Sequence, residues 1–232
     1  MCTVSYVPLG PGQFILTSNR DENPDRITHQ PGEETTIVQS ETIICPKDSK
    51  AGGSWIAMST QGKVACLLNG AFKKHSQEPP YRKSRGLILM EYFSFSSAIE
   101  FHNKIDLKGI ENFTLLMLED DRVFELRWDG EEKFFKFIVE TEVQLWSSCT
   151  LYDEDSAMQK ENKFNSWIET KEKPTVDELN FFHGLNNPDG FLLERPMVKT
   201  VSITSIQKMD SFISMHYYDL LTNIAVEKQV EL

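Results

Sequence analysis

The chain has no apolar run long enough to cross a membrane, and its few cysteines include no closely spaced pair. The longest apolar runs, such as FILT and GLILMEYF, fall far short of the roughly 20 residues that a membrane-spanning helix needs. The N-terminus also lacks the basic region and apolar stretch of a secretory signal peptide. Cys2, Cys45, Cys66 and Cys149 form no CxxC motif, a pattern that favours reduced thiols. We therefore expect a cytoplasmic protein without a membrane span.

Positive charge is scarce as well, because 24 lysines and arginines stand against 35 acidic residues in a chain of net charge −11. Such a surface repels phosphate backbones, so we expect no nucleic-acid partner. The five histidines show no HExxH or similar ligand spacing, and we expect neither a metal nor another cofactor. The partner that these exclusions favour is a small-molecule substrate or ligand.

What the chain does contain is short segments rich in β-branched residues, in blocks separated by segments of helical period. Strands are predicted over residues 2–7, 12–18, 35–38, 42–44, 54–59, 63–68, 112–119, 122–128, 133–139, 198–204, 211–218 and 222–228. One or two helices are predicted over 84–103, and others over 155–170 and 175–182. Blocks of strands with segregated helices indicate an α+β fold, with stacked antiparallel sheets covered by helices on their outer faces. We expect one domain over residues 1–232.

Cys2 would be the first residue of the mature protein if Met1 is removed. Its thiol and its α-amine would then share one carbon, and both titrate near neutral pH. A partly unprotonated amine can act as the general base for the thiol, without a histidine. The alternative is that Cys2 is an ordinary buried strand residue.

A charged tetrad, Asn19-Arg20-Asp21-Glu22, closes the second predicted strand just before Asn23-Pro24. If Gly10-Pro11-Gly12 forms a hairpin turn, the tetrad returns beside the N-terminus. Because neighbouring strand residues point to opposite faces, Arg20 and Asp21 share a face only if the strand has already broken. Otherwise Arg20 with Glu22, or Asn19 with Asp21, faces Cys2. A solvated turn with a surface ion pair is the simpler alternative.

Two further positions have a chemical and a purely structural interpretation. Asn69 follows the apolar run KVACLL, where its amide could donate to an oxyanion or simply form a turn before Gly70. In the segment 51–55, AGGSW, two glycines allow close backbone approach, and Trp55 could form a pocket wall or a core contact.

Taken together, MCT, SNRDEN, AGGSWIAMSTQGKVACLLN and WSSCTLYD resemble the NRDE family, also called the transport and Golgi organisation protein two family. That family is similar to the cysteine N-terminal-nucleophile (Ntn) hydrolases, such as choloylglycine hydrolase and penicillin V acylase. The resemblance implies a four-layer αββα sandwich and hydrolysis of a non-peptide amide bond. It places Cys2 on the nucleophile and Asn69 on the asparagine that binds the oxyanion.

Three positions depart from the acylase pattern. The acylases have Arg-x-x-Asp after the second strand, whereas Arg20 and Asp21 are adjacent. An asparagine expected near WSSCT is replaced by Ser148 or Cys149. The late arginine expected before the closing strands could be Arg195 or Lys199, or be missing.

The leading hypothesis is an N-terminal-cysteine hydrolase that cleaves an acyl-amide bond of a small molecule. The alternative is a non-catalytic binding or trafficking protein for a lipid- or haem-related ligand on the same scaffold. The predicted catalytic residues are Cys2, Arg20, Asp21 and Asn69, and the predicted substrate-binding residues are Asn19, Glu22, Trp55 and Arg195.

Overall fold

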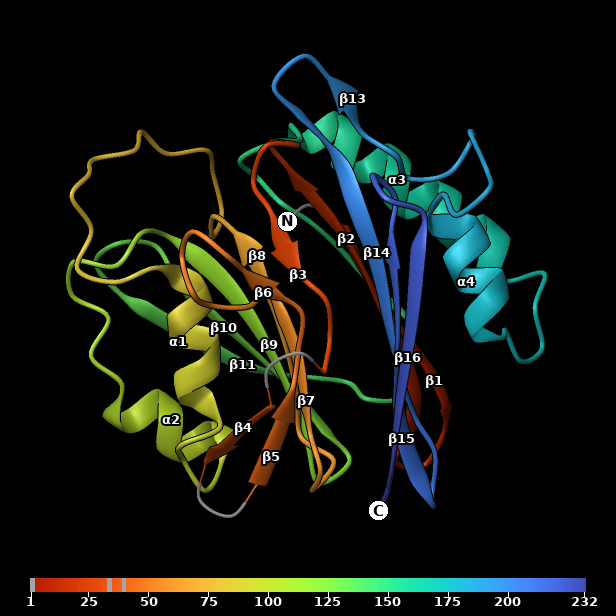
Figure 1. The fold of residues 1–232 in the computed structure, drawn as a ribbon, viewed down its shortest axis with the longest axis horizontal. Coiled ribbons are helices and arrows are strands. Elements are labelled where there is room, and N and C mark those ends of the chain that lie inside the picture. Colours follow the sequence, from red (N-terminus) through yellow and green to blue (C-terminus); the bar gives the residue numbers. More distant parts are fainter. Residues whose placement is uncertain (1–2, 33–34, 39–40) are drawn as a thin grey trace.

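The computed structural model describes residues 3–32, 35–38 and 41–232, and most of its strands form two antiparallel sheets that face each other (Figure 1). We call them sheet I and sheet II. The strands of sheet I are, in spatial order, β12 (Gln144–Ser147), β1 (Thr3–Gly10), β2 (Gln13–Glu22), β14 (Val198–Lys208), β15 (Phe212–Asp219) and β16 (Ile224–Glu231), with β13 (Glu194–Arg195) beside β14. The strands of sheet II are β11 (Lys133–Ile138), β10 (Arg122–Trp128), β9 (Phe113–Glu119), β8 (Val64–Asn69), β7 (Ile56–Ser59), β5 (Glu41–Ile44) and β4 (Thr35–Val38).

Helices cover the outer face of each sheet (Figure 1). The helices α1 (Arg85–Tyr92) and α2 (Ala98–Lys104) lie on sheet II, and α3 (Glu154–Ile168) and α4 (Val176–His183) lie on sheet I. The predicted αββα sandwich is therefore confirmed. None of the described helices is both long enough and apolar enough to span a membrane.

The β1–β2 hairpin forms as its turn residues predict. Gly12 has a φ of +67°, a conformation that glycine adopts without steric cost, and β2 ends at Glu22 just before Asn23-Pro24. The register pairs Thr3 with Asn19, so β1 begins beside the end of β2.

Strand alternation decides which side chains of this hairpin meet which layer. Val4, Tyr6 and Leu16 lie in the large core between the sheets. Val7 and Ile15 lie instead in the smaller core beneath α3 and α4, together with Phe164, Leu179 and Phe182. Up to Arg20, even-numbered residues of the hairpin therefore face sheet II, and odd-numbered residues face the helices.

Four short strands differ from the sequence prediction, and one of them is β13 beside β14. Strand β12 was not predicted, and it pairs with the other edge of β1, so that Thr3 also faces Ser147. A separate two-stranded sheet of β3 (Thr28–His29) and β6 (Lys47–Asp48) lies outside both large sheets. This small sheet holds Asp48 beside the tetrad.

Candidate active site

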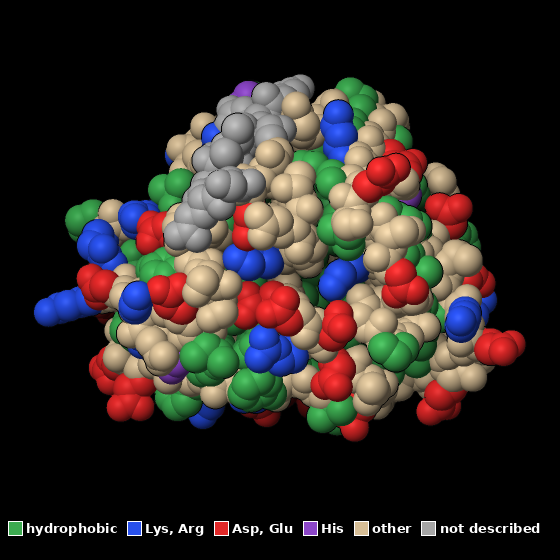
Figure 2. Space-filling view, turned by 90° about the horizontal axis from the view of Figure 1, so that it is seen from below, with side chains coloured by type: hydrophobic (Ala, Val, Ile, Leu, Met, Phe, Trp, Pro, Cys, Tyr) green, Lys and Arg blue, Asp and Glu red, His purple; other side chains and the backbone are tan. Residues whose placement is uncertain are grey.

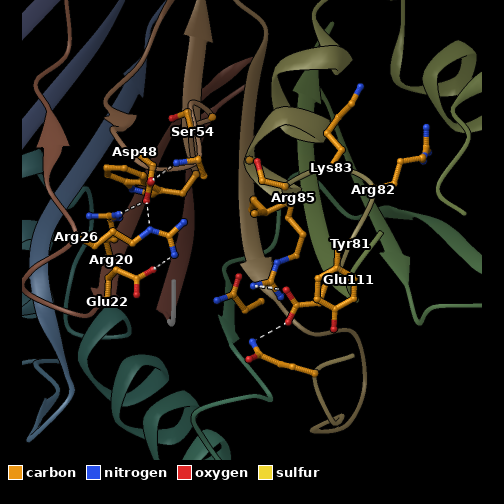
Figure 3. A pocket seen from close by; sticks show the side chains of 18 residues that line it. Arg20, Glu22, Arg26, Asp48, Ser54, Tyr81, Arg82, Lys83, Arg85 and Glu111 are labelled. Atoms are coloured by element: carbon orange, nitrogen blue, oxygen red, sulfur yellow. Dashed lines mark hydrogen bonds and ion pairs between the residues drawn. The ribbon is translucent and has the colours of Figure 1, made fainter. Parts of the chain in front are cut away.

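A cavity of about 580 Å³ opens between the two sheets where β2 and β8 end (Figure 3). A neighbouring cavity of about 340 Å³ shares five of its lining residues, so the two form one hollow region. The shared residues are Glu22, Asn69, Gln77, Arg85 and Glu111. We call this region the tetrad cavity, because Arg20, Asp21 and Glu22 contribute to its walls.

Arg20 is the buried cation of this cavity. Its side chain is 3% exposed, and Nη2 lies 2.7 Å from Oδ2 of Asp48. Nη1 donates to Oγ1 of Thr28 at 2.6 Å, and the guanidinium carbon lies 4.4 Å from the centre of the Trp55 ring. Burial lowers the pKa of Arg20, while the Asp48 carboxylate opposes that shift. The guanidinium is thus held in a fixed plane by an ion pair, a hydroxyl and an aromatic face.

Asp48 is fixed as firmly as its partner. Its Oδ1 accepts from the backbone N–H groups of Lys50 and Ala51, at 3.0 and 2.8 Å. Its Oδ2 also lies 2.6 Å from Nε of Arg26, which in turn contacts Glu22 at 3.2 Å. Figure 3 shows this chain of charges along one wall of the cavity. Glu22, predicted to bind substrate, is therefore at the cavity with its carboxylate already paired.

The glycines before Trp55 allow two backbones to touch. A Cβ on Gly53 would lie 2.4 Å from the carbonyl carbon of Gly86, and one on Gly86 would lie 2.9 Å from the carbonyl oxygen of Ser54. The start of α1 therefore packs directly against the segment 51–55. Trp55 is 4% exposed and lines the cavity, and its Nε1 has no hydrogen-bond partner among the residues that the structure describes. Trp55 is both a core residue and a cavity wall.

Asp21 faces the smaller part of the cavity, away from Arg20. Its Oδ1 accepts from the hydroxyl of Thr200 at 2.5 Å, and its Oδ2 accepts from the hydroxyl of Tyr152 at 3.2 Å. The structure therefore places Arg20 and Asp21 in different parts of the same hollow region.

Asn69 is the last residue of β8 and lines both parts of the cavity. Its backbone is fixed, because it pairs with Phe113 of β9 and its carbonyl accepts from Oγ of Ser148 at 2.7 Å. Gly70 follows with a φ of +82°, which turns the chain sharply away from the strand. The structure thus brings Arg20 and Asn69 to one cavity from opposite sheets.

Asn19 does not line the tetrad cavity, because it points to the opposite face of sheet I. Its Nδ2 donates to the carbonyls of His183 and Phe191, so its Oδ1 must accept from Nδ1 of His183 at 2.6 Å. Nε2 of His183 then accepts from the hydroxyl of Ser5 at 2.7 Å. Burial lowers the pKa of His183 to about 3, so its imidazole is neutral at pH 7. Asn19 holds α4 on the sheet and has no free amide hydrogen for a ligand.

The structure also describes the candidate residues from the second half of the chain. Arg195 is exposed on β13, outside the tetrad cavity, and its Nη2 donates to the carbonyl of Leu151 at 3.2 Å. Ser148 is 1% exposed and bonded to Asn69 as described. Cys149 is partly exposed, and burial raises its pKa. Neither Arg195 nor Lys199 lines the cavity.

Sequence reasoning missed the second charged cluster of the cavity. Arg85 lies 3.2 Å from Glu111, which also accepts from Gln77 at 3.0 Å and contacts His75 at 3.3 Å (Figure 3). Arg85 follows Ser84 at a predicted helix start, which is a local signal that could have indicated it. Glu111 lies between Ile110 and Asn112 in the approach to a strand, and nothing near it in the sequence marks it.

The larger cavity has a charge opposite to that of the whole chain. Five of its lining residues are basic and three are acidic, which leaves two positive charges, whereas the chain carries −11. The basic residues are Arg20, Arg26, Arg82, Lys83 and Arg85, and the acidic residues are Glu22, Asp48 and Glu111. Such a cavity is suited to a polar ligand and stabilises negative charge.

Cys2, the predicted nucleophile, lies outside the described residues. Its neighbour Thr3 is buried between β2 and β12, and the hydroxyl of Thr3 accepts from Nζ of Lys160 at 2.8 Å. Among the described residues, Cys45 and Cys66 are buried, and burial raises the pKa of Cys45 to about 11 and that of Cys66 to about 12, so that neither thiol is reactive at neutral pH.

Solved structures with this arrangement include two hydrolases. A variant of the conjugated bile acid hydrolase from Clostridium perfringens aligns with a TM-score of 0.60 at 10% identity, over 100% of this chain and 96% of that chain. The Caenorhabditis elegans orthologue of N-acylethanolamine-hydrolyzing acid amidase aligns with a TM-score of 0.50 at 10% identity, over 88% and 92% of the two chains. At such low identity, these likenesses show the fold alone, and the fold is that of the Ntn hydrolases.

Comparison of sequences defines the family. The mouse (Mus musculus) protein "Transport and Golgi organization 2 homolog" is 28% identical over 100 residues, which are 42% of this chain. The same match spans about a third, 34%, of the mouse protein. The family model described as "Transport and Golgi organisation 2" matches residues 1–228, almost the whole chain. The chain therefore belongs to the Transport and Golgi organisation 2 family.

Proposed function

We propose that the protein, after removal of Met1, is an N-terminal-cysteine hydrolase that cleaves an acyl-amide bond of a small polar molecule. One observation supports this most directly: β1 starts beside the tetrad, and the even-numbered side chains of the hairpin face the space between the sheets. In that space Arg20 and Asn69 line one cavity. The two solved structures named above are hydrolases on the same fold, which favours an amide substrate.

The proposed reaction has two steps. The thiolate of Cys2 attacks the amide carbonyl, the C–N bond breaks, and the amine leaves with a proton from the α-ammonium group. Water then hydrolyses the thioester, which releases the acid and restores the thiol. Asn69 donates to the oxyanion in both steps, and the Arg20 guanidinium stabilises the thiolate. Asp21, which accepts from Thr200 and Tyr152, holds the α-ammonium group.

Thiol labelling tests the nucleophile. At pH 7 an unperturbed thiol is about 3% thiolate, whereas a pKa of about 11 leaves Cys45 with about 0.01%. Iodoacetamide should therefore label Cys2 at least about 300-fold faster than Cys45, and intact mass should show one adduct on a chain that lacks Met1. The matched variant Cys2→Ser should lose this adduct. Retained Met1 on nearly all molecules, or equal labelling of all four cysteines, contradicts the proposal.

Turnover tests the oxyanion donor. On a panel of N-acyl amino acids and N-acyl lactones, Asn69→Ala should reduce turnover by about 10²–10³ and leave the labelling of Cys2 unchanged. The two readouts separate activation of the nucleophile from stabilisation of the oxyanion. A loss of labelling in Asn69→Ala would show that Asn69 acts on the thiol instead.

A non-catalytic binding protein is the second candidate, and Ser148 favours it. Ser148 or Cys149 stands where the resemblance to the acylases implies an asparagine, and the hydroxyl of Ser148 is buried and donates to the backbone carbonyl of Asn69. It is thus engaged away from any oxyanion. Selective labelling of Cys2 with no turnover across the panel would support this function over hydrolysis.

A further inference from the structure

A second cavity, of about 430 Å³, lies at the other end of the sandwich. It forms where the turn between β1 and β2, the turn between β9 and β10 and the turn between β7 and β8 come together. We call it the turn-end cavity. Gly12 at its rim and Arg20 are eight positions apart along the hairpin, which at about 3.3 Å per residue separates these two residues by roughly 26 Å.

Four side chains of the core between the sheets form the apolar part of the wall of the turn-end cavity. Tyr6, Phe14, Leu118 and Val123 line it, and each is at most 6% exposed. The rings of Tyr6 and Phe14 lie 5.7 Å apart on the wall that sheet I supplies. Facing sheets normally fill the space between them with interdigitated side chains, so this end of the core is incomplete.

Water is a poor occupant of the apolar part of this space, where the hydroxyl of Tyr6 already has a partner. The hydroxyl of Tyr6 donates to the carbonyl of Glu140 at 2.8 Å, and burial raises the pKa of Tyr6 to about 12, so it stays neutral. An ordered buried water needs about three polar partners, which Phe14, Leu118 and Val123 do not supply. An apolar molecule bound in the cavity would remove the apolar side chains of its wall from water, which favours binding.

The rim of the cavity has charges of both signs. Nζ of Lys208 lies 3.4 Å from Oδ1 of Asp121, and Arg122 lines the cavity beside them. With Glu119 and Glu140 the lining has three acidic and two basic residues, a net charge of −1. Figure 2 shows the same end of the molecule, where acidic and basic side chains are interspersed without a continuous patch of either sign. A ligand with a full charge gains little here, and a carboxylate is disfavoured.

Lys208 gives the cavity one directional polar contact. Its side chain is 16% exposed, and its ammonium group has three N–H donors, of which Asp121 accepts at long range. A neutral oxygen acceptor at the rim could take another donor while an apolar body fills the space below. At about 30 Å³ for each water molecule, the volume corresponds to about 14 waters, or a ligand on the order of 15 non-hydrogen atoms.

We propose that the turn-end cavity is a binding site for an uncharged, mainly apolar small molecule that carries one carbonyl or hydroxyl oxygen. The site is separate from the tetrad cavity and does not depend on the function proposed for it. Its volume falls in the range of known ligand sites, and its few polar groups are placed at the rim, as in such sites generally.

The experiment uses the full-length protein and the neutral fluorescent probe N-phenylnaphthylamine. Wild type should bind the probe saturably. Thr141→Trp places an indole over the cavity from an exposed rim position and should weaken binding by at least about tenfold. Thr222→Trp, the same change in the exposed turn between β15 and β16, should bind like wild type. Circular dichroism and Tm confirm that both variants are folded.

Competition defines the ligand class. A medium-chain methyl ketone should displace the probe at least about tenfold more effectively than the carboxylate or the ammonium of the same chain length. Lys208→Met keeps the apolar stem and removes the donor, so it should weaken the ketone several-fold and leave an alkane of equal length unaffected. No saturable binding to wild type, unchanged binding in Thr141→Trp, or equal displacement by the carboxylate would each overturn the proposal.

Discussion

His183 makes the stability of the fold depend on pH in a calculable way. It is fully buried with a pKa of about 3, whereas a histidine in the unfolded chain has a pKa near 6.5. Between pH 6.5 and pH 3, the unfolded state therefore binds a proton at His183 that the folded state does not bind. Stability is present in full above pH 6.5 and falls as the pH drops from there towards 3. Between pH 7 and pH 5 this one group should cost about 2 kcal/mol of unfolding free energy.

The variant His183→Gln removes the titration and isolates that contribution. At pH 7 it should be less stable than wild type by about 1–3 kcal/mol, because Ser5 and Asn19 lose a well-matched partner. Its loss of stability from pH 7 to pH 5 should be about 2 kcal/mol smaller than that of wild type. All other titrating groups are common to both proteins and cancel in the difference.

Urea unfolding at the two pH values measures both quantities. The matched control is Ser5→Ala, which removes a hydrogen bond to His183 but keeps its burial. It should lower stability and retain the wild-type dependence on pH. If His183→Gln and wild type lose the same free energy between pH 7 and pH 5, then His183 is not buried as a neutral group and the assigned network is wrong.

Two further predictions concern the walls of the tetrad cavity. Gly53→Ala should lower the unfolding free energy by about 1–3 kcal/mol more than Gly52→Ala in urea melts. A Cβ at Gly53 meets the backbone of Gly86 at 2.4 Å, whereas one at Gly52 meets nothing within 4 Å and costs only the strain of a φ of +70°, about 1–2 kcal/mol. Equal losses would contradict the close contact between Gly53 and Gly86. Asp48→Asn should cost about 3–5 kcal/mol, because it leaves the buried charge of Arg20 without its partner, whereas Asp120→Asn at an exposed ion pair should cost about 1 kcal/mol or less. A small loss in Asp48→Asn would mean that Arg20 is solvated.

The parts of the fold that were predictable are those set by neighbouring residues. Gly10-Pro11-Gly12 specifies a turn and Asn23-Pro24 ends a strand through backbone chemistry alone, so both ends of the hairpin follow from the sequence. Strand β12 was missed because it is four residues long and is held by β1, some 140 residues away in the chain. No local pattern records such a partner.

The site was predictable to a similar degree. Alternation along β2 indicates that Arg20 and Asn19 point to opposite faces, and the family resemblance identifies Asn69. The same alternation could not predict which face of β2 lines the cavity. That depends on His183, which is 164 residues away in the sequence and forms a hydrogen bond with Asn19 on the opposite face. Asp48 and Glu111 were missed for the same reason, since only the folded chain brings them to the tetrad.

The order of strands in sheet I has a consequence for synthesis on the ribosome. Sheet II uses strands between residues 35 and 138, so it can assemble from one continuous stretch of nascent chain. The β1–β2 hairpin emerges before sheet II, yet its neighbours β12 and β14 are made only after sheet II, at 144–147 and 198–208. Until then both of its edges are unpaired and its apolar faces are uncovered, which is the condition that invites aggregation. Chaperone binding at this stage would increase the yield of folded protein. A chain truncated before β14 would leave β2 without the strand that pairs with its outer edge.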